Sequence, residues 1–191
     1  MKKSGLVLLI VGIMFCLACP AFADDKEGFY LGVGGSYALE NFQTYGSNSY
    51  DDATGFNIKA GYKQSRASAT EFSFDYFPEF KWTHPRDYLI PATGMVSEKI
   101  RVYSVMLAQK LSIPNDTFRP FLIGGIGYMS AESEHTPTLG SPDETGFCYK
   151  AGLGMDVFIT SNISLGLEGS YFFGVGDVRY GNFTLGVAYH F

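Results

Sequence analysis

Hydrophobic residues alternate with small or polar residues along most of the chain. The pattern is clearest in the last stretch, where the apolar positions are Phe183, Leu185, Val187, Tyr189 and Phe191 and mainly small or polar residues separate them. Successive side chains of a β-strand point to opposite faces, so a period of two indicates a strand with one apolar face.

Turn-forming residues interrupt this alternation and divide the chain into eight predicted strands. The fifth is the least regular, because its apolar residues fall on both faces and leave its register open. The predicted strands are Gly28–Glu40, Gly55–Lys63, Ser68–Phe80, Glu98–Leu111, Arg119–Ala131, Phe147–Val157, Ser164–Tyr171 and Tyr180–Phe191.

The connections between these strands alternate in length. Those after the first, third and fifth strands are long, and those after the second, fourth and sixth are short. All the long connections therefore lie at one end of an up-and-down arrangement, as in outer-membrane barrels. The long ones are Asn41–Thr54, Lys81–Ser97 and Glu132–Thr145, and the short ones are Gln64–Ala67, Pro114–Phe118 and Thr160–Asn162.

The two faces of the strands differ in side-chain size. One face is dominated by Gly, Ala, Ser, Asn and Thr with few charges, and the other is rich in Phe, Tyr and Leu. An eight-stranded barrel is only wide enough inside for side chains, so we expect the bulky face to point outward to lipid. Closure pairs every backbone group, as a bilayer requires. The pattern predicts an all-β, eight-stranded antiparallel up-and-down transmembrane β-barrel. The alternative, a secreted barrel of the lipocalin type, would turn the apolar face inward.

The N-terminal segment has the features of a secretory signal peptide. Two lysines precede an apolar run over residues 6–17, and Ala21 and Ala23 form a small-x-small cleavage site. Cleavage after Ala23 would separate a signal peptide over residues 1–23 from one barrel domain over residues 24–191. The alternative is a lipidated N-terminus at Cys19.

Charge and cysteine content limit the partners and the covalent links. Loss of residues 1–23 removes two lysines and no acidic residue, which changes the formal net charge from −5 to −7. A chain this acidic is not suited to binding nucleic acid. Outside the predicted signal peptide the sole cysteine is Cys148, so we expect no intramolecular disulfide. Its position in the alternation predicts that Cys148 points inward as a small filler rather than a nucleophile.

Two segments resemble the eight-stranded outer-membrane β-barrels that are similar to the transmembrane domain of outer membrane protein A. They are RPFLIGGIGY at residues 119–128 and FTLGVAYHF at residues 183–191. The resemblance implies the outer membrane of a Gram-negative bacterium, contact with its lipid and lipopolysaccharide, and assembly by the barrel assembly machinery. It also implies that the terminal strand carries the signal this machinery reads, at Phe183, Leu185, Val187, Tyr189 and Phe191.

Seven charged residues occupy positions that the alternation turns inward. A buried ion without a partner is costly, so we expect these residues to form ion pairs that fill the lumen. The alternative is a narrow, porin-like path for small solutes. The seven are Lys59, Lys63, Glu71, Asp75, Lys150, Asp156 and Glu168.

Basic residues gather around the long connection between the third and fourth strands. Nearby Trp82, Tyr88 and Tyr103 are of the type that favours a membrane interface. We therefore predict contacts with lipopolysaccharide phosphates, and the alternative is a set of solvated loop charges. The basic residues are Lys81, Arg86, Lys99 and Arg101.

The sequence offers little for catalysis. His84, His135 and His190 are dispersed, and no His-x-Ser triplet, which a lipid A deacylase barrel would be expected to show, occurs. No His, Cys or carboxylate cluster has metal-ligand spacing. We expect no metal, no cofactor and no enzymatic activity, with a lipid-modifying enzyme as the third alternative. The predicted function is a structural or surface-recognition role, in which the long connections meet extracellular ligands.

Overall fold

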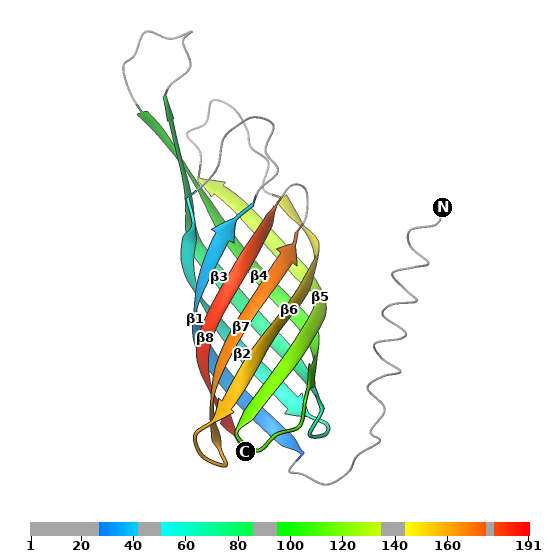
Figure 1. Ribbon diagram of the computed structural model, residues 1–191. Helices are drawn as coiled ribbons and strands as arrows, with labels where there is room; N and C mark the ends of the chain where they lie inside the picture. The colour runs from blue at the N-terminus through cyan, green and yellow to red at the C-terminus, as the bar shows by residue number, and fades with distance from the viewer. Residues whose placement is uncertain (1–26, 42–50, 86–94, 135–143, 175–177) are drawn as a thin grey trace, which may run out of the picture.

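The computed structural model describes residues 27–41, 51–85, 95–134, 144–174 and 178–191. Its eight strands form one closed antiparallel barrel, in which each strand pairs with the next along the chain and β8 pairs with β1 (Figure 1). The predicted fold class is confirmed. Within these ranges no helix has the length and apolar character needed to cross a membrane. The strands are β1 (Gly28–Glu40), β2 (Ala53–Lys63), β3 (Ser68–Pro85), β4 (Met95–Ser112), β5 (Phe118–Glu134), β6 (Glu144–Phe158), β7 (Ile163–Phe173) and β8 (Arg179–His190).

The strands β3 and β4 are longer than the sequence predicts. The alternation ends the third strand at Phe80, whereas β3 continues to Pro85, which pairs with Met95 at the start of β4. A β-bulge between Phe77 and Phe80 shifts the register there, and it also interrupts the period of two on which the prediction rests. Much of the predicted connection Lys81–Ser97 that the structure describes is therefore strand.

The two ends of the barrel differ in the way the connection lengths predict. At one end, here called the short-turn end, β1 begins and β8 finishes, and the backbone N–H of Phe191 donates to the carbonyl of Phe29 at 3.0 Å (Figure 1). In outer-membrane barrels the short turns lie in the periplasm, so this end corresponds to the periplasmic end of such barrels. The opposite end is called the long-loop end. The short turns are residues 64–67, 113–117 and 159–162, and the connections at the long-loop end are residues 41–52, 86–94, 135–143 and 174–178.

The outer surface of the barrel is apolar. Along β1, for example, Phe29, Leu31 and Val33 are 66%, 54% and 59% exposed, and the residues between them turn inward. Leu185 on β8 is similarly exposed. Such a surface would be unfavourable in water and matches the hydrocarbon core of a bilayer, so the outward orientation of the bulky face is confirmed.

The inner face is less uniform than the sequence predicts. Small and polar residues do line it, but the side chains of Tyr30 and Phe121 also point inward and are almost fully buried. Each is opposite a glycine that makes room for it: a Cβ on Gly61 would collide with the ring of Tyr30, and one on Gly154 would collide with Phe121. The interior therefore also holds large rings, because glycines on neighbouring strands create local space for them.

Candidate functional site

A layer of aromatic side chains crosses the lumen toward the long-loop end. Phe172 and Tyr180 stack with their ring centroids 4.8 Å apart, and Phe77 meets Tyr180 edge-on at 5.4 Å. Phe80 lies 5.9 Å from Phe77. All four rings are 0% exposed. We call these four residues the aromatic layer. Val102, Met106, Met129 and Cys148 pack in the same buried cluster, so this part of the lumen is filled with side chains.

Below the aromatic layer, charged side chains occupy the lumen. The ammonium of Lys150 lies 2.5 Å from a carboxylate oxygen of Glu168 and 5.4 Å from the centre of the Phe172 ring. The carboxylate of Asp75 accepts hydrogen bonds from the Asn57 amide at 2.8 Å and the Ser73 hydroxyl at 3.4 Å. Each charge in this layer therefore has a charged or polar partner, as burial requires.

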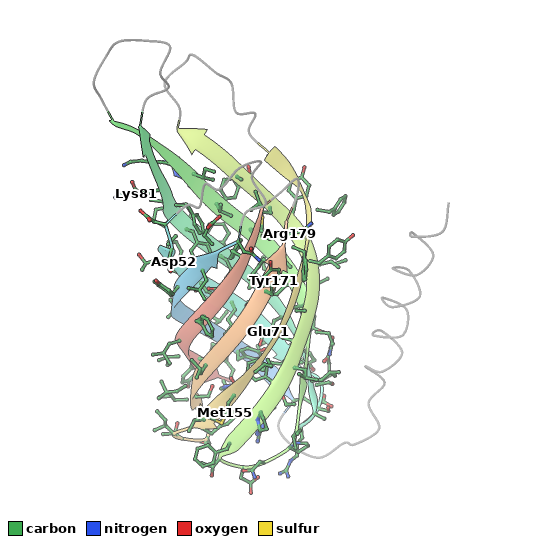
Figure 2. All side chains as sticks on the ribbon, turned by 45° about the horizontal axis from the view of Figure 1, so that its top comes forward. Asp52, Glu71, Lys81, Met155, Tyr171 and Arg179 are labelled. Atoms are coloured by element: carbon green, nitrogen blue, oxygen red, sulfur yellow. The ribbon has the colours of Figure 1, made fainter. Side chains whose placement is uncertain are left out.

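A second group of charges lies nearer the short-turn end. Lys110 bridges two acidic residues, at 2.6 Å from Asp156 and 3.4 Å from Glu71. The hydroxyl of Tyr30 donates to Glu71 at 2.5 Å. Figure 2 shows Glu71 between the strands, in the body of the barrel. Lys59 completes the group, since it interacts electrostatically with Glu71 and Asp156. We call the two groups together the lumen ion network.

The structure places all seven of the charged residues predicted for the interior on the inner face. Six of them belong to the lumen ion network, and the seventh, Lys63, lines a cavity toward the short-turn end together with Lys59 and Asp156. Two further inward cations that the sequence pattern did not predict, Lys110 and Arg119, are 5% and 7% exposed. Lys110 lies at a position that the alternation along its strand turns inward, so the alternation alone could have predicted it. Arg119 is the second residue of β5, a strand in which apolar residues on both faces leave the register open in the sequence.

The basic residues at the long-loop end have acidic neighbours that the sequence prediction did not include. Lys99 lies 2.6 Å from Glu79, and Lys81 lies 3.4 Å from the same carboxylate. Arg101 lies 3.6 Å from Glu132. Lys81 and Asp52 lie near this end of the barrel in Figure 2. These cations are thus partly neutralised within the protein.

Several predicted residues fall outside the part of the chain that the structure describes. These are Ala21, Ala23, Arg86 and His135. His190 is described, and its Nε2 atom lies 2.9 Å from the hydroxyl of Ser164 inside the lumen. Among the described residues, no group of three or more His, Cys, Asp or Glu side chains is arranged to hold a metal ion.

The five residues of the predicted assembly signal form one outward row, four on β8 and the fifth, Phe191, directly after its last residue. Their exposed fractions run from 45% for Val187 to 67% for Phe191, and the rings of Tyr189 and Phe191 meet edge-on at 5.1 Å. β8 is held on both sides, by β7 and by β1. The row comprises Phe183, Leu185, Val187, Tyr189 and Phe191.

Tyr189→Ala should slow assembly by the purified barrel assembly machinery more than it lowers the stability of the folded barrel. The side chain is half exposed on the outer face, so its removal leaves no internal cavity. Folding rates into lipid vesicles with and without the machinery would measure the first effect, and urea unfolding the second. Leu167→Ala, on the outer face of neighbouring β7, is the matched control. Equal slowing of both variants, or slowing that does not depend on the machinery, would contradict an assembly signal at this position.

Comparisons with known proteins agree with this architecture. The chain matches the family model described as outer membrane protein beta-barrel domain over residues 7–191. An uncharacterized protein of Coxiella burnetii is 28% identical over 170 residues, covering 72% of this chain and 68% of the relative.

Solved structures with a similar fold include three bacterial proteins. Ail, the attachment invasion locus protein of Yersinia pestis, is 20% identical with a TM-score of 0.59, covering 87% of this chain and 100% of Ail. Neisserial surface protein A is 21% identical with a TM-score of 0.58 and the same coverage. The outer membrane protein OprG of Pseudomonas aeruginosa is 14% identical with a TM-score of 0.62, covering 88% of this chain and 98% of OprG. At these identities the structural likeness shows the fold.

The family model spans nearly the whole chain, and the closed barrel with its apolar outer surface has the form that the model describes. The chain therefore belongs to the outer membrane protein beta-barrel domain family and is a protein of the bacterial outer membrane.

Proposed function

We propose that this protein is a closed, non-enzymatic scaffold that displays its long connections for recognition at the cell surface. The observation that carries the proposal is the filling of the lumen at two levels, by the aromatic layer and by the lumen ion network. A barrel that is filled in this way holds its rim in a fixed shape, and the connections at the long-loop end are then the part free to vary and to bind.

The same filling argues against the alternative of a solute path. A solute would have to displace four fully buried rings and separate ion pairs such as Lys150–Glu168. Separating a buried pair leaves charges without partners, which costs several kcal/mol, on the order of 3–5 for one pair. Eight strands also leave an interior only wide enough for side chains.

Two of the similar structures support a role at the surface. Ail is named as an attachment invasion locus protein and was solved with the heparin analogue sucrose octasulfate, and the neisserial protein is named as a surface protein. By analogy, we propose that the long connections of this chain meet extracellular ligands. The cations near the rim, Lys81, Lys99 and Arg101, are proposed to contact lipopolysaccharide phosphates in competition with Glu79 and Glu132.

Replacing residues 86–94 and 135–143 by Gly-Ser linkers of equal length should abolish attachment of protein-bearing bacteria to host cells while the barrel still folds. The change spares every residue of the lumen and the strands. Folding is checked by testing whether the unheated barrel stays folded in detergent. Attachment is measured by counting the bacteria that are bound to the host cells.

The control replaces the short turn 113–117 in the same way, and we expect it to leave attachment unchanged. Unchanged attachment after the loop replacements would overturn the recognition role. A steady ion conductance of the unmodified protein in planar bilayers would overturn the closed scaffold and favour the porin-like alternative.

A further inference from the structure

Hydroxyl and amide groups line the lumen between the rings of the aromatic layer and the charges of the lumen ion network. The inward residues of β7 show the order: Phe172 belongs to the aromatic layer, Ser170 comes next, and Glu168 belongs to the lumen ion network. On β8 the next inward residue after Tyr180 is Asn182, which is directly opposite Ser170. A level of neutral polar groups therefore separates the rings from the charges.

Four hydroxyl and amide oxygens at this level have no hydrogen-bond partner among the described residues. Each of the four residues is at most 8% exposed. The amide nitrogen of Asn182 does donate, to Thr184 at 3.2 Å, but the amide oxygen accepts nothing within the described chain. A buried polar atom without a partner is unfavourable, and folded proteins leave few of them. We call the four residues the polar belt, and they are Ser104, Ser170, Tyr180 and Asn182.

Two of these oxygens lie close to the carboxylate of Asp75. Ser104 is directly opposite Asp75 in the pairing of β3 with β4, and the hydroxyl of Tyr180 lies beside Ser104 and interacts electrostatically with Asp75. Asp75 is 0% exposed, and its hydrogen-bond donors within the described chain are two neutral groups, the Asn57 amide and the Ser73 hydroxyl. A carboxylate can accept about four hydrogen bonds, so Asp75 has room for more donors.

Water is the ligand that these groups fit. A buried water molecule makes about three hydrogen bonds, to polar groups that otherwise lack partners, and it can both donate and accept. The oxygens of Asp75 and Asn182 need donors, whereas the hydroxyl of Tyr180 can donate. A larger molecule would have to pass the fully buried rings on one side or buried ion pairs such as Lys110–Asp156 on the other.

We propose that the polar belt binds water molecules that are sealed inside the lumen. One water accepts hydrogen bonds from the hydroxyls of Ser104 and Tyr180 and donates to the carboxylate of Asp75. Another donates to the amide oxygen of Asn182 and contacts the hydroxyl of Ser170. These waters connect the aromatic layer to the lumen ion network and brace the barrel from within. The inference concerns the lumen and does not depend on the proposed surface recognition.

Tyr180→Phe and Ser104→Ala test the proposal through the direction of the stability change. If the hydroxyl binds water, its removal should lower the equilibrium constant for folding about fivefold, the usual effect of one hydrogen bond. If the hydroxyl is buried without a partner, its removal should raise that constant. Urea unfolding in lipid vesicles gives the constant. Tyr128→Phe removes the same group from the outer face, where the residue is 52% exposed, and is expected to leave the constant unchanged.

NMR of Tyr180→Phe in lipid nanodiscs tests for the water directly. The ring of this variant has no exchangeable hydrogen, so transfer of magnetisation from water to its ring protons requires a water molecule nearby. We expect this transfer, because Ser104 and Asp75 remain to hold the water. The ring of Phe183 on the same strand faces lipid and is expected to show none.

Absence of the transfer at position 180, or a rise in the folding constant of Tyr180→Phe or Ser104→Ala, would overturn the proposal. The conductance of the unmodified protein is a separate measurement, so a failure of the closed scaffold can be told apart from a failure of the water sites.

Discussion

Glu168→Ala should destabilise the folded barrel by about 3–5 kcal/mol, the usual cost of leaving one member of a buried ion pair without its partner. Glu168 is 5% exposed, and its carboxylate lies 2.5 Å from the equally buried ammonium of Lys150. Once the carboxylate is gone, Lys150 must stay charged in a poorly solvated lumen or give up its proton. Equilibrium unfolding in urea, with the protein in lipid vesicles, measures the free energy of unfolding.

Two variants identify the cause of this loss. Glu79→Ala breaks the Lys99–Glu79 pair, which has a similar distance of 2.6 Å but side chains that are 46% and 30% exposed, and should cost less than about 1 kcal/mol. The double variant Lys150→Met/Glu168→Leu should recover most of the lost stability, because two apolar side chains replace the two charges. If Glu168→Ala lowers the free energy of unfolding by no more than Glu79→Ala does, the lumen is hydrated enough to screen its charges. That result would contradict the proposal that the barrel is a closed scaffold.

Phe172→Ala is expected to cost about 3–5 kcal/mol as well, for a different reason. Its ring is fully buried in the aromatic layer and stacks on Tyr180 at 4.8 Å. Surrounding side chains are held by strands that cannot move inward without breaking the barrel ladder, so the deletion leaves a cavity. The same unfolding experiment in vesicles gives the magnitude.

The adjacent Phe173 provides the matched control, because it belongs to the same strand and faces lipid with 45% of its surface exposed. Phe173→Ala should be clearly less damaging than Phe172→Ala, since lipid chains fill the space that the ring vacates and no cavity remains. Similar losses in the two variants would mean that the aromatic layer is not tightly packed. A rise in bilayer conductance of Phe172→Ala alone would show that this layer, rather than the lumen ion network, blocks the lumen.

Local alternation was sufficient to predict the strands and the direction of most side chains. The first predicted strand, Gly28–Glu40, coincides with β1, and both Lys150 and Glu168 were placed inward. Their pairing could not be predicted, because it depends on the register between β6 and β7. In that register Glu168 is opposite Gly154, and Lys150 is opposite Phe172, so the ion pair forms along the barrel interior and not between directly facing positions.

Features that depend on contacts between strands were predicted poorly. The inward ring of Phe121 needs the space beside Gly154 on β6, and nothing within the fifth strand itself shows that this space exists. The extension of β3 depends on its pairing with β4 past the bulge at Phe77. Likewise, Glu79 becomes a partner of Lys99, and Glu132 a partner of Arg101, only when neighbouring strands bring them together.

The pairing of β8 with β1 has a consequence for how the protein enters the membrane. This seam runs from Tyr30 opposite His190 to Glu40 opposite Tyr180, and it joins the two most distant strands of the chain. Until it forms, β1 and β8 each expose a row of unpaired N–H and C=O groups, which hydrocarbon does not tolerate. A partly inserted barrel is therefore unstable in the bilayer, and insertion should be concerted with closure, which makes the meeting of the first and last strands the slow step of folding.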